Sequence, residues 1–350
     1  MGLREYLIKR LVFSLILIVF VAMLNFMIFE LMPGNPVDYF IKPGMKQEQI
    51  DALIRLWELD RPIWERFAKS LYNLFTGNFL NTHSFVSQQA ISIEISGRLV
   101  NTLLLVGTST VLSMLIGILF GVVAAYKRGG KLDSGLVLVA LTTFSFPSFW
   151  MGMLAILIFS IQLHWFPSAH PFPPEWASTY SASGGLPPAL FKATIPGIGV
   201  PIAIPSGVEI IGRIHHLVLP VTVLTLFQYG GWLLLTRASV LETITEDYVV
   251  TARAKGIQER TILFKHVLKN ASLPLITNAA LSFGFMLSGA IITEGVFSYR
   301  GLGAWMWESV VFKDFPVMQS MFFIIGVCVI LANFIADLTY GIMDPRIKYG

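Results

Sequence analysis

Long apolar runs alternate with polar stretches along the whole chain. Six of these runs approach or exceed the roughly 20 residues that cover the hydrocarbon core of a bilayer. They fall at 11–31, 101–126, 136–163, 217–235, 273–292 and 317–338. The first run lacks the short core and the small-residue cleavage site of a signal peptide, so we interpret it as an uncleaved span. The pattern predicts an all-α membrane protein with six transmembrane helices.

The polar stretches divide the chain into three parts. Residues 1–32 are predicted to form an N-terminal tail and the first span, and 33–98 an external helical region with two amphipathic helices. Residues 99–350 would form the core, with five spans. Within it, 163–216 is rich in proline, glycine, serine and aromatic residues and predicts a long irregular external insert, while 241–273 predicts a cytoplasmic loop.

The two sides of the membrane are assigned from the basic residues. Of the 25 Lys and Arg residues, 14 lie in about 70 residues at the two ends and in the 127–135 and 237–272 loops, against 11 in about 140 residues of the other loops. Cytoplasmic loops carry the excess of basic residues. We therefore expect a multi-pass protein of the cytoplasmic (inner) membrane with both termini in the cytoplasm.

Composition agrees with this interpretation and excludes other classes. The chain is 55% hydrophobic and 13% charged, whereas a soluble globular domain has about 25% charged residues. The single cysteine excludes a disulfide framework and a thiolate metal site. The net charge of +4 needs no nucleic acid to explain it, since the basic residues are distributed by membrane side.

Polar side chains inside the spans are candidates for the wall of a pathway. The third span contains Ser145 and Ser148 on either side of Pro147, which is expected to kink the helix, and the fourth contains Gln228. Polar groups inside spans tend to face the helix bundle. Each of the three could equally bond to a neighbouring helix.

The 241–273 loop carries a dense mixture of both charge signs. Apolar residues at helical spacing predict two short amphipathic helices, the first through Ile244, Tyr248 and Ala252 and the second beginning near Ile262. Gly256 lies between them and can end the first helix in a left-handed conformation. The small side chains of Ala252 and Ala254 are expected to leave the backbone open to close approach by a partner.

This loop resembles the cytoplasmic EAA loop of ABC importer permeases, in the form found in the dipeptide, oligopeptide and nickel family. The resemblance rests on DYVVTARAKGIQERTILFKHVLKNASLP, and SFPSFW, FSYRGLG and DLTYGIMDPRIKYG are also similar to segments of that family. The Glu-Ala-Ala of the general pattern falls on Val250, Thr251 and Ala252 and its glycine on Gly256, so one alanine and the glycine are kept.

The resemblance implies a type I permease that docks a coupling helix into a cytosolic ATPase. The residues it assigns to coupling are Tyr248, Thr251, Ala252, Arg253, Ala254, Lys255 and Gly256. It further implies a second homologous permease, two ATPases that bind ATP and Mg²⁺, and an external substrate-binding protein. Peptides are the expected substrate. Members of the family also carry nickel or oligosaccharides, and both remain open.

Catalytic and metal-binding alternatives find little support. The chain has no G-x-x-x-x-G-K-[ST], H-E-x-x-H or G-x-S-x-G motif, so it is not expected to be an enzyme or to hold a cofactor. His215 and His216, with His164 and His170, lack regular ligand spacing, and no metal site is predicted. An ion-coupled transporter is the main alternative, but the centres of the spans are nearly free of charge.

Overall fold

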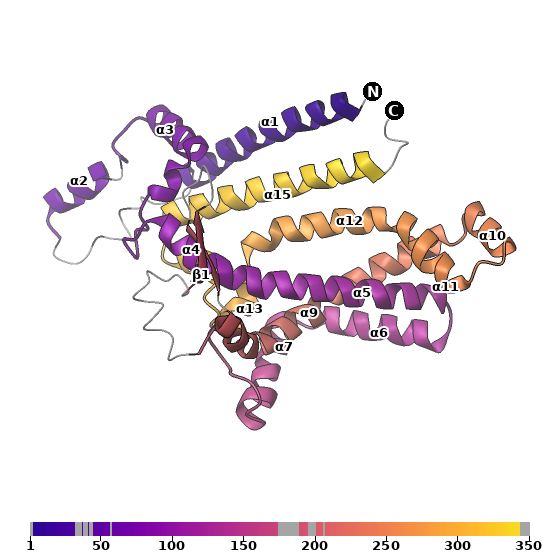
Figure 1. Cartoon of the computed structure of the whole chain (residues 1–350). Helices are drawn as coiled ribbons and strands as arrows, with labels where there is room; N and C mark the ends of the chain where they lie inside the picture. The colour runs from indigo at the N-terminus through magenta and orange to yellow at the C-terminus, as the bar shows by residue number, and fades with distance from the viewer. Residues whose placement is uncertain are drawn as a thin grey trace.

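The computed structural model is helical apart from one small sheet (Figure 1). It describes residues 3–31, 37, 41, 45–56, 58–173, 189–194, 201–205 and 207–343. Five helices in this part are long and apolar enough to cross a membrane, at Glu5–Glu30, Ile91–Tyr126, Ile211–Thr243, Glu259–Ser288 and Phe315–Leu338. The bent pair Lys131–Ser145 and Ser148–Gln162 gives a sixth if it is one span. The predicted all-α membrane fold is confirmed.

The elements follow one another in a simple order. The first half contains α1 (Leu3–Glu30), α2 (Gln47–Leu56), α3 (Ile63–Thr76), η2 (Asn78–Asn81), α4 (Ile91–Thr102), η3 (Leu103–Gly107), α5 (Thr108–Tyr126), α6 (Lys131–Ser145), α7 (Ser148–Ala155) and η4 (Ile156–Gln162). The second half contains β1 (Ala189–Thr194), β2 (Pro201–Pro205), α9 (Gly207–Thr243), α10 (Asp247–Ala254), α11 (Glu259–Thr261), η6 (Ile262–Val267), α12 (Leu268–Phe285), η7 (Met286–Ser288), α13 (Ile291–Val296), α14 (Leu302–Val311) and α15 (Phe315–Met343).

The start of α1, the end of α15, the turn between α5 and α6, and α10 all lie at one end of the helix bundle, which we call the α10 end (Figure 1). At the opposite end lie α2, α3, the start of α4, and α13, and we call it the α3 end (Figure 1). The segments predicted to be cytoplasmic therefore gather at one end, as far as they lie within the described residues. The C-terminal residues 344–350 lie outside them.

Three predicted boundaries and the predicted irregular insert need correction. α4, η3 and α5 form one helical run from Ile91, α9 begins at Gly207, and the fifth span starts at Glu259. The early starts are polar, and a polar stretch predicts a loop, but part of this polar surface is buried against the protein itself, as at Ser96 and Arg213. Within the insert, β1 pairs with β2 as an antiparallel two-stranded sheet.

The third predicted span is broken rather than merely kinked. The axes of the two halves meet at 93°. Phe146, which precedes Pro147, has an extended backbone with ψ of 136°, because the proline ring disfavours a helical conformation in the residue before it. α6 therefore ends at Ser145, and α7 starts in a new direction at Ser148.

Small residues bring the helices of the bundle into close contact. A Cβ added at Gly117 of α5 would lie 2.3 Å from Trp232 Cβ of α9, and one added at Gly121 would lie 2.6 Å from Thr236 Cβ. At Gly230 of α9 it would lie 2.8 Å from the carbonyl oxygen of Ala140 in α6. Backbones approach this closely in membranes where small residues line the interface. α5, α6 and α9 therefore pack as one unit.

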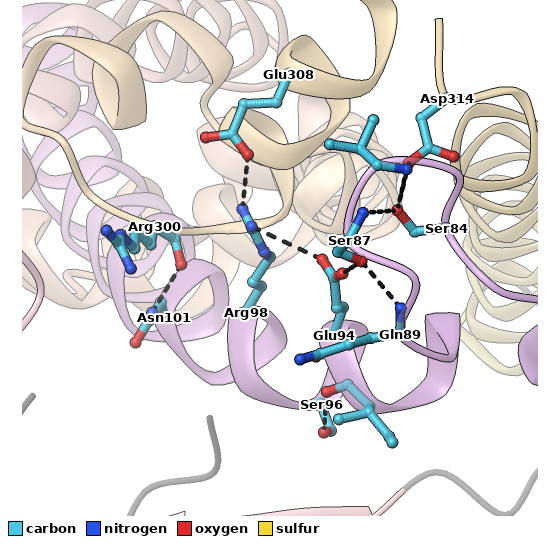
Figure 2. A network of polar contacts seen from close by, with 12 residues as sticks. Ser84, Ser87, Gln89, Glu94, Ser96, Arg98, Asn101, Arg300, Glu308 and Asp314 are labelled. Atoms are coloured by element: carbon cyan, nitrogen blue, oxygen red, sulfur yellow. Dashed lines mark hydrogen bonds and ion pairs between the residues drawn. The ribbon is translucent and has the colours of Figure 1, made fainter. Parts of the chain in front are cut away.

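A polar network closes the α3 end (Figure 2). The buried Asp314 accepts hydrogen bonds from the hydroxyl of Ser84 and from the amides of Phe85 and Val86, at 3.0 and 3.3 Å for the two amides. Arg98 of α4 reaches Glu308 of α14 at 3.3 Å (Figure 2). These contacts fasten α4 and the 84–87 loop to the last third of the chain.

Glu294 is fully buried behind this network and caps α14. Its carboxylate accepts from the hydroxyl of Thr102 at 3.0 Å, from the amide of Ala304 at 2.7 Å and from the amide of Ala290 at 3.3 Å. Thr102 in turn accepts from the amide of Leu302 at 2.7 Å. The first amides of a helix have no partner within it, so these side chains satisfy them.

Candidate functional site

The helix α10 is a separate two-turn element that ends at Ala254, two residues before Gly256. Glu246 precedes it in an extended conformation, and Gly256 follows with φ of 73°, the left-handed conformation predicted from the sequence. The amide of Ile257 donates to the carbonyl of Ala252 at 3.3 Å, and that of Gly256 to Arg253 at 2.9 Å. These two bonds form a Schellman motif, which ends a helix most readily at glycine. The glycine fixes where α10 stops.

One face of α10 packs into a small apolar core at the α10 end. Val249 is fully buried and Ala252 is 8% exposed. Their neighbours include Val122 of α5, Val240 of α9, and Ile262. Ala252 therefore does not line an outer surface, and the expectation that its small side chain opens the backbone to a partner is wrong for this residue. Tyr248 is half-buried against the same core.

The other face of α10 is bare. Thr251, Arg253, Ala254, Lys255 and Gly256 are exposed, so five of the seven residues assigned to coupling lie on one continuous surface. Val250, which the assignment left out, exposes 58% of its surface there. A Cβ added at Gly256 would meet nothing within 4 Å, so the surface at the turn is open.

An ion pair spans the turn at Gly256. Arg253 Nη2 lies 2.6 Å from Glu259 Oε1, and its Nε lies 3.2 Å from Oε2, so the pair is bidentate. The Glu259 carboxylate raises the pKa of the Arg253 guanidinium above its ordinary value, chiefly through these hydrogen bonds. The pair ties α10 to α11 across the turn. Both side chains are about a third or more exposed, so the stabilisation is small.

α10 is connected to the bundle at both of its ends. α9 precedes it in the chain, and α11 and η6 follow it and lead directly into α12. Near the end of α9, Arg237 donates to both carboxylate oxygens of Asp133 in α6, at 2.7 and 2.8 Å. Asp133 is buried and also accepts from the amide of Gly129 at 2.9 Å. α10 thus adjoins the packed unit of α5, α6 and α9.

The three candidate pathway residues lie near the break between α6 and α7. Ser145 is exposed and donates to the carbonyl of Leu141 in its own helix at 2.7 Å. Gln228 of α9 is half-buried, with its side-chain oxygen 3.5 Å from the Ser113 hydroxyl. The preceding residues Phe144 and Phe227 stack at 5.8 Å, which places Ser145 and Gln228 in the same region. Ser148 begins α7 and is half-buried.

The histidines near the α3 end contact backbone rather than one another's ring nitrogens. His215 Nε2 lies 3.0 Å from the carbonyl of Trp165, and His216 Nδ1 lies 3.1 Å from that of His170. Among the described residues, no group of three His, Cys, Asp or Glu side chains is placed to hold a metal ion.

Comparison with known protein families accounts for nearly the whole chain. Residues 117–349 match the family of binding-protein-dependent transport system inner membrane components, and residues 3–105 match the N-terminal region of such membrane components. The chain belongs to this family of inner-membrane permease components. It is thus a multi-pass membrane protein whose family works with a substrate-binding protein and further transport components, and the family is not itself catalytic.

Relatives in several bacteria share its length. The oligopeptide transport system permease protein AppB of Bacillus subtilis is 33% identical over 98% of this chain and 99% of its own. The di/tripeptide transport system permease protein DppB of Pseudomonas aeruginosa is 33% identical over 94% of each chain. A putative peptide transport system permease protein of Brucella abortus is 31% identical over 98% of each.

Sequence reasoning missed two features of this permease. It did not find the pair of Asp133 and Arg237, whose residues are 104 positions apart. A lone acidic residue in the basic 127–135 loop and an arginine at the end of the fourth apolar run were the available signal. It also missed that Val250 belongs to the bare face of α10.

Proposed function

We propose that this permease forms half of the translocation pathway of an ATP-driven peptide importer. The other half would be a second homologous permease, with two cytosolic ATPases that bind ATP and Mg²⁺ and an external binding protein that delivers the peptide. The observation that carries the proposal is α10, a short helix held by one apolar face with its other face bare. Full-length relatives named as peptide permeases support the substrate class.

The bare face of α10 is suited to a cleft in an ATPase. The small residues Ala254 and Gly256 are exposed there, and Arg253 and Lys255 add positive charge beside Val250. Closure of an ATPase dimer on ATP would move α10 as a rigid body, because Val249 and Ala252 fix it to the bundle. A ligand shifts such an equilibrium only through contacts that differ between the two states. Docked α10 would supply those contacts.

Replacing Gly256 tests the coupling role. In Gly256→Val, a branched side chain must adopt the left-handed conformation, which costs on the order of 1–2 kcal/mol, and it also adds bulk to the bare face. We expect loss of the ATPase from the purified complex and loss of peptide uptake. Arg253→Ala should have a milder effect, since an exposed ion pair contributes roughly 0–1 kcal/mol.

Gly256→Asn is the control for strain, because asparagine tolerates the left-handed region better than valine. If Asn also releases the ATPase while the permease keeps its thermal stability, bulk at the docking face is responsible. A Gly256→Val permease that retains its ATPase and transports normally would mean that this loop is only a solvated connector.

We propose that the α10 end faces the cytoplasm, with both termini on that side. The test is single-cysteine labelling with a membrane-impermeant reagent in a Cys328-free background. Gln89, in the exposed loop at the α3 end, should react in intact cells, and Gln258 only after the membrane is opened. Labelling of Gln258 from outside would reverse the orientation.

We propose that Ser145, Ser148 and Gln228 contribute polar groups to the pathway beside the break in the third span. Ser145→Val, Ser148→Val and Gln228→Leu should each lower the rate of peptide uptake while the complex remains assembled. Thr142→Val is a matched control, because Thr142 is also exposed on α6 and also donates to a carbonyl of its own helix. Uptake unchanged in all three variants would remove these residues from the pathway.

A further inference from the structure

We propose that α3 is an interfacial helix whose outward aromatic stripe, Trp64, Ala68, Tyr72 and Phe75, lies against the lipid surface at the α3 end. The stripe recurs at spacings of four, four and three residues, so it occupies one side of the helix. Trp64, Tyr72 and Phe75 expose 66%, 64% and 52% of their surfaces. No charged residue falls within the stripe.

The remaining faces of α3 already have protein partners. Phe67 packs edge-on against Phe26 of α1 with ring centroids 5.2 Å apart, and Leu74 is buried against α1 and α15. The charged residues lie on a third side, where Arg66 pairs with Glu30 at 2.8 Å and Lys69 pairs with Glu58. The stripe and the packed face together form one broad apolar surface, and the ion pairs lie on the opposite side. This is the pattern of a helix that lies in a membrane surface.

Contacts to the spans fix the depth of α3. The 26-residue span of α1 is about 39 Å long at 1.5 Å per residue, which exceeds the roughly 30 Å hydrocarbon core by a few ångströms at each end. Glu30 ends this span, and Phe26 lies about 6 Å before its end, close to the boundary of the core. Arg66 and Phe67 meet these two residues, so the first turns of α3 lie at that boundary.

The other end of α3 gives a second depth marker. Phe75 lies 6.5 Å, centroid to centroid, from Phe323, which is about 12 Å along α15 from its start at Phe315. α3 therefore crosses the outermost turns of two spans, as its position beside the end of α1 also shows (Figure 1). Tryptophan and tyrosine favour this zone because the ring is apolar and the N–H or O–H remains near water.

The exposed apolar surface of α1 beside α3 indicates that lipid covers the stripe. α1 packs on α15 and α3, and elsewhere it exposes large apolar side chains, among them Phe20, Leu24 and Ile28. α3 joins α1 at this part of the helix, because Phe67 contacts Phe26, which lies between the exposed Leu24 and Ile28 in the sequence. The uncharged stripe on α3 therefore adds to the apolar surface at the membrane boundary. A soluble binding protein would meet α3 from the aqueous side, where the ion pairs lie.

Spin labels on the stripe test the proposal in the assembled complex. Ala68→Cys and Tyr72→Cys are labelled with a nitroxide in a Cys328→Ser background, with cysteine-free partner subunits, in lipid nanodiscs. Collision rates are measured with oxygen, which concentrates in lipid, and with a water-soluble nickel chelate. References are Gln89→Cys, in the exposed loop at the same end, and Phe20→Cys, on the exposed side of α1.

We expect oxygen-to-nickel collision ratios at 68 and 72 that are several-fold above that at 89 and below that at 20. A ratio equal to that at 89 would place the stripe in water and overturn the proposal. Immobilised labels that neither agent reaches would also overturn it, because a partner protein would then cover the stripe. The measurement does not depend on which side of the membrane α3 occupies or on ATPase docking, so its failure is distinct from failure of the coupling role.

Discussion

Replacing Arg237 with alanine is expected to destabilise the permease by about 3–5 kcal/mol, the range for breaking a buried ion pair from one side. The carboxylate of Asp133 would stay buried with the amide of Gly129 as its remaining partner among the hydrogen bonds described. Loss of a bidentate partner at 2.7 and 2.8 Å leaves the buried carboxylate without its directly bonded counterion.

The chain supplies a matched control in Arg253. It also forms a bidentate pair with a carboxylate, but the side chains of Arg253 and Glu259 are 43% and 32% exposed, against 28% and 6% for Arg237 and Asp133. Arg253→Ala should therefore cost roughly 0–1 kcal/mol. The double variant Asp133→Ala with Arg237→Ala should recover part of the loss, since it leaves no buried charge.

Thermal unfolding of the purified permease can be followed through its single cysteine. Cys328 lies in α15 and is partly buried, so a thiol-reactive dye reports when α15 loosens. Equal unfolding temperatures for Arg237→Ala and Arg253→Ala would show that burial of Asp133 does not strengthen its ion pair with Arg237.

Replacing Gly301 with alanine is the second substitution with a large expected effect. A Cβ there would lie 2.5 Å from the carboxylate of Glu294 and 2.5 Å from the hydroxyl of Thr102. Gly301 has φ of −102°, which any residue adopts, so the penalty is steric. Overpacking of this kind costs typically about 1–3 kcal/mol, and here it would also separate Glu294 from the amides that it caps.

Gly295→Ala is the control for this substitution. Gly295 lies in α13, one residue after Glu294, and a Cβ there meets nothing within 4 Å. It should be neutral or stabilising, because alanine favours a helix by about 1 kcal/mol over glycine. The same thiol-reactivity assay compares the two. If Gly301→Ala unfolds at the temperature of Gly295→Ala, the network around Glu294 can rearrange without cost.

Local signals predicted the parts of this fold that local physics decides. The apolar runs identified the spans because an apolar run of that length has few other stable environments, and glycine after a short helix identified the turn at Gly256. The proline in the third span predicted a kink at the position where the span is in fact broken. These features depend on residues within a few positions of one another.

Features that depend on distant neighbours were not predicted. The apolar stripe through Tyr248 and Ala252 is the face of α10 that the bundle covers, but the stripe did not show that this burial would remove Ala252 from the surface left open to a partner. α9 extends beyond its apolar run because Arg213 bonds to Asn101 at 2.8 Å inside the protein, and α4 extends beyond its run through the buried Ser96. A polar residue such as Arg213 predicts a loop when the sequence alone is considered, because its bonding partner Asn101 lies 112 positions away.

The length of α9 has a mechanical consequence. Its 37 residues make a rod of about 55 Å, almost twice the thickness of the hydrocarbon core. Arg213 near one end is bonded to Asn101 of α4, and Arg237 near the other is bonded to Asp133 of α6. A tilt of about 10° around the middle of such a rod would displace each end by about 5 Å in opposite directions. A change in contacts at either membrane face would then change the same quantity, the tilt of α9.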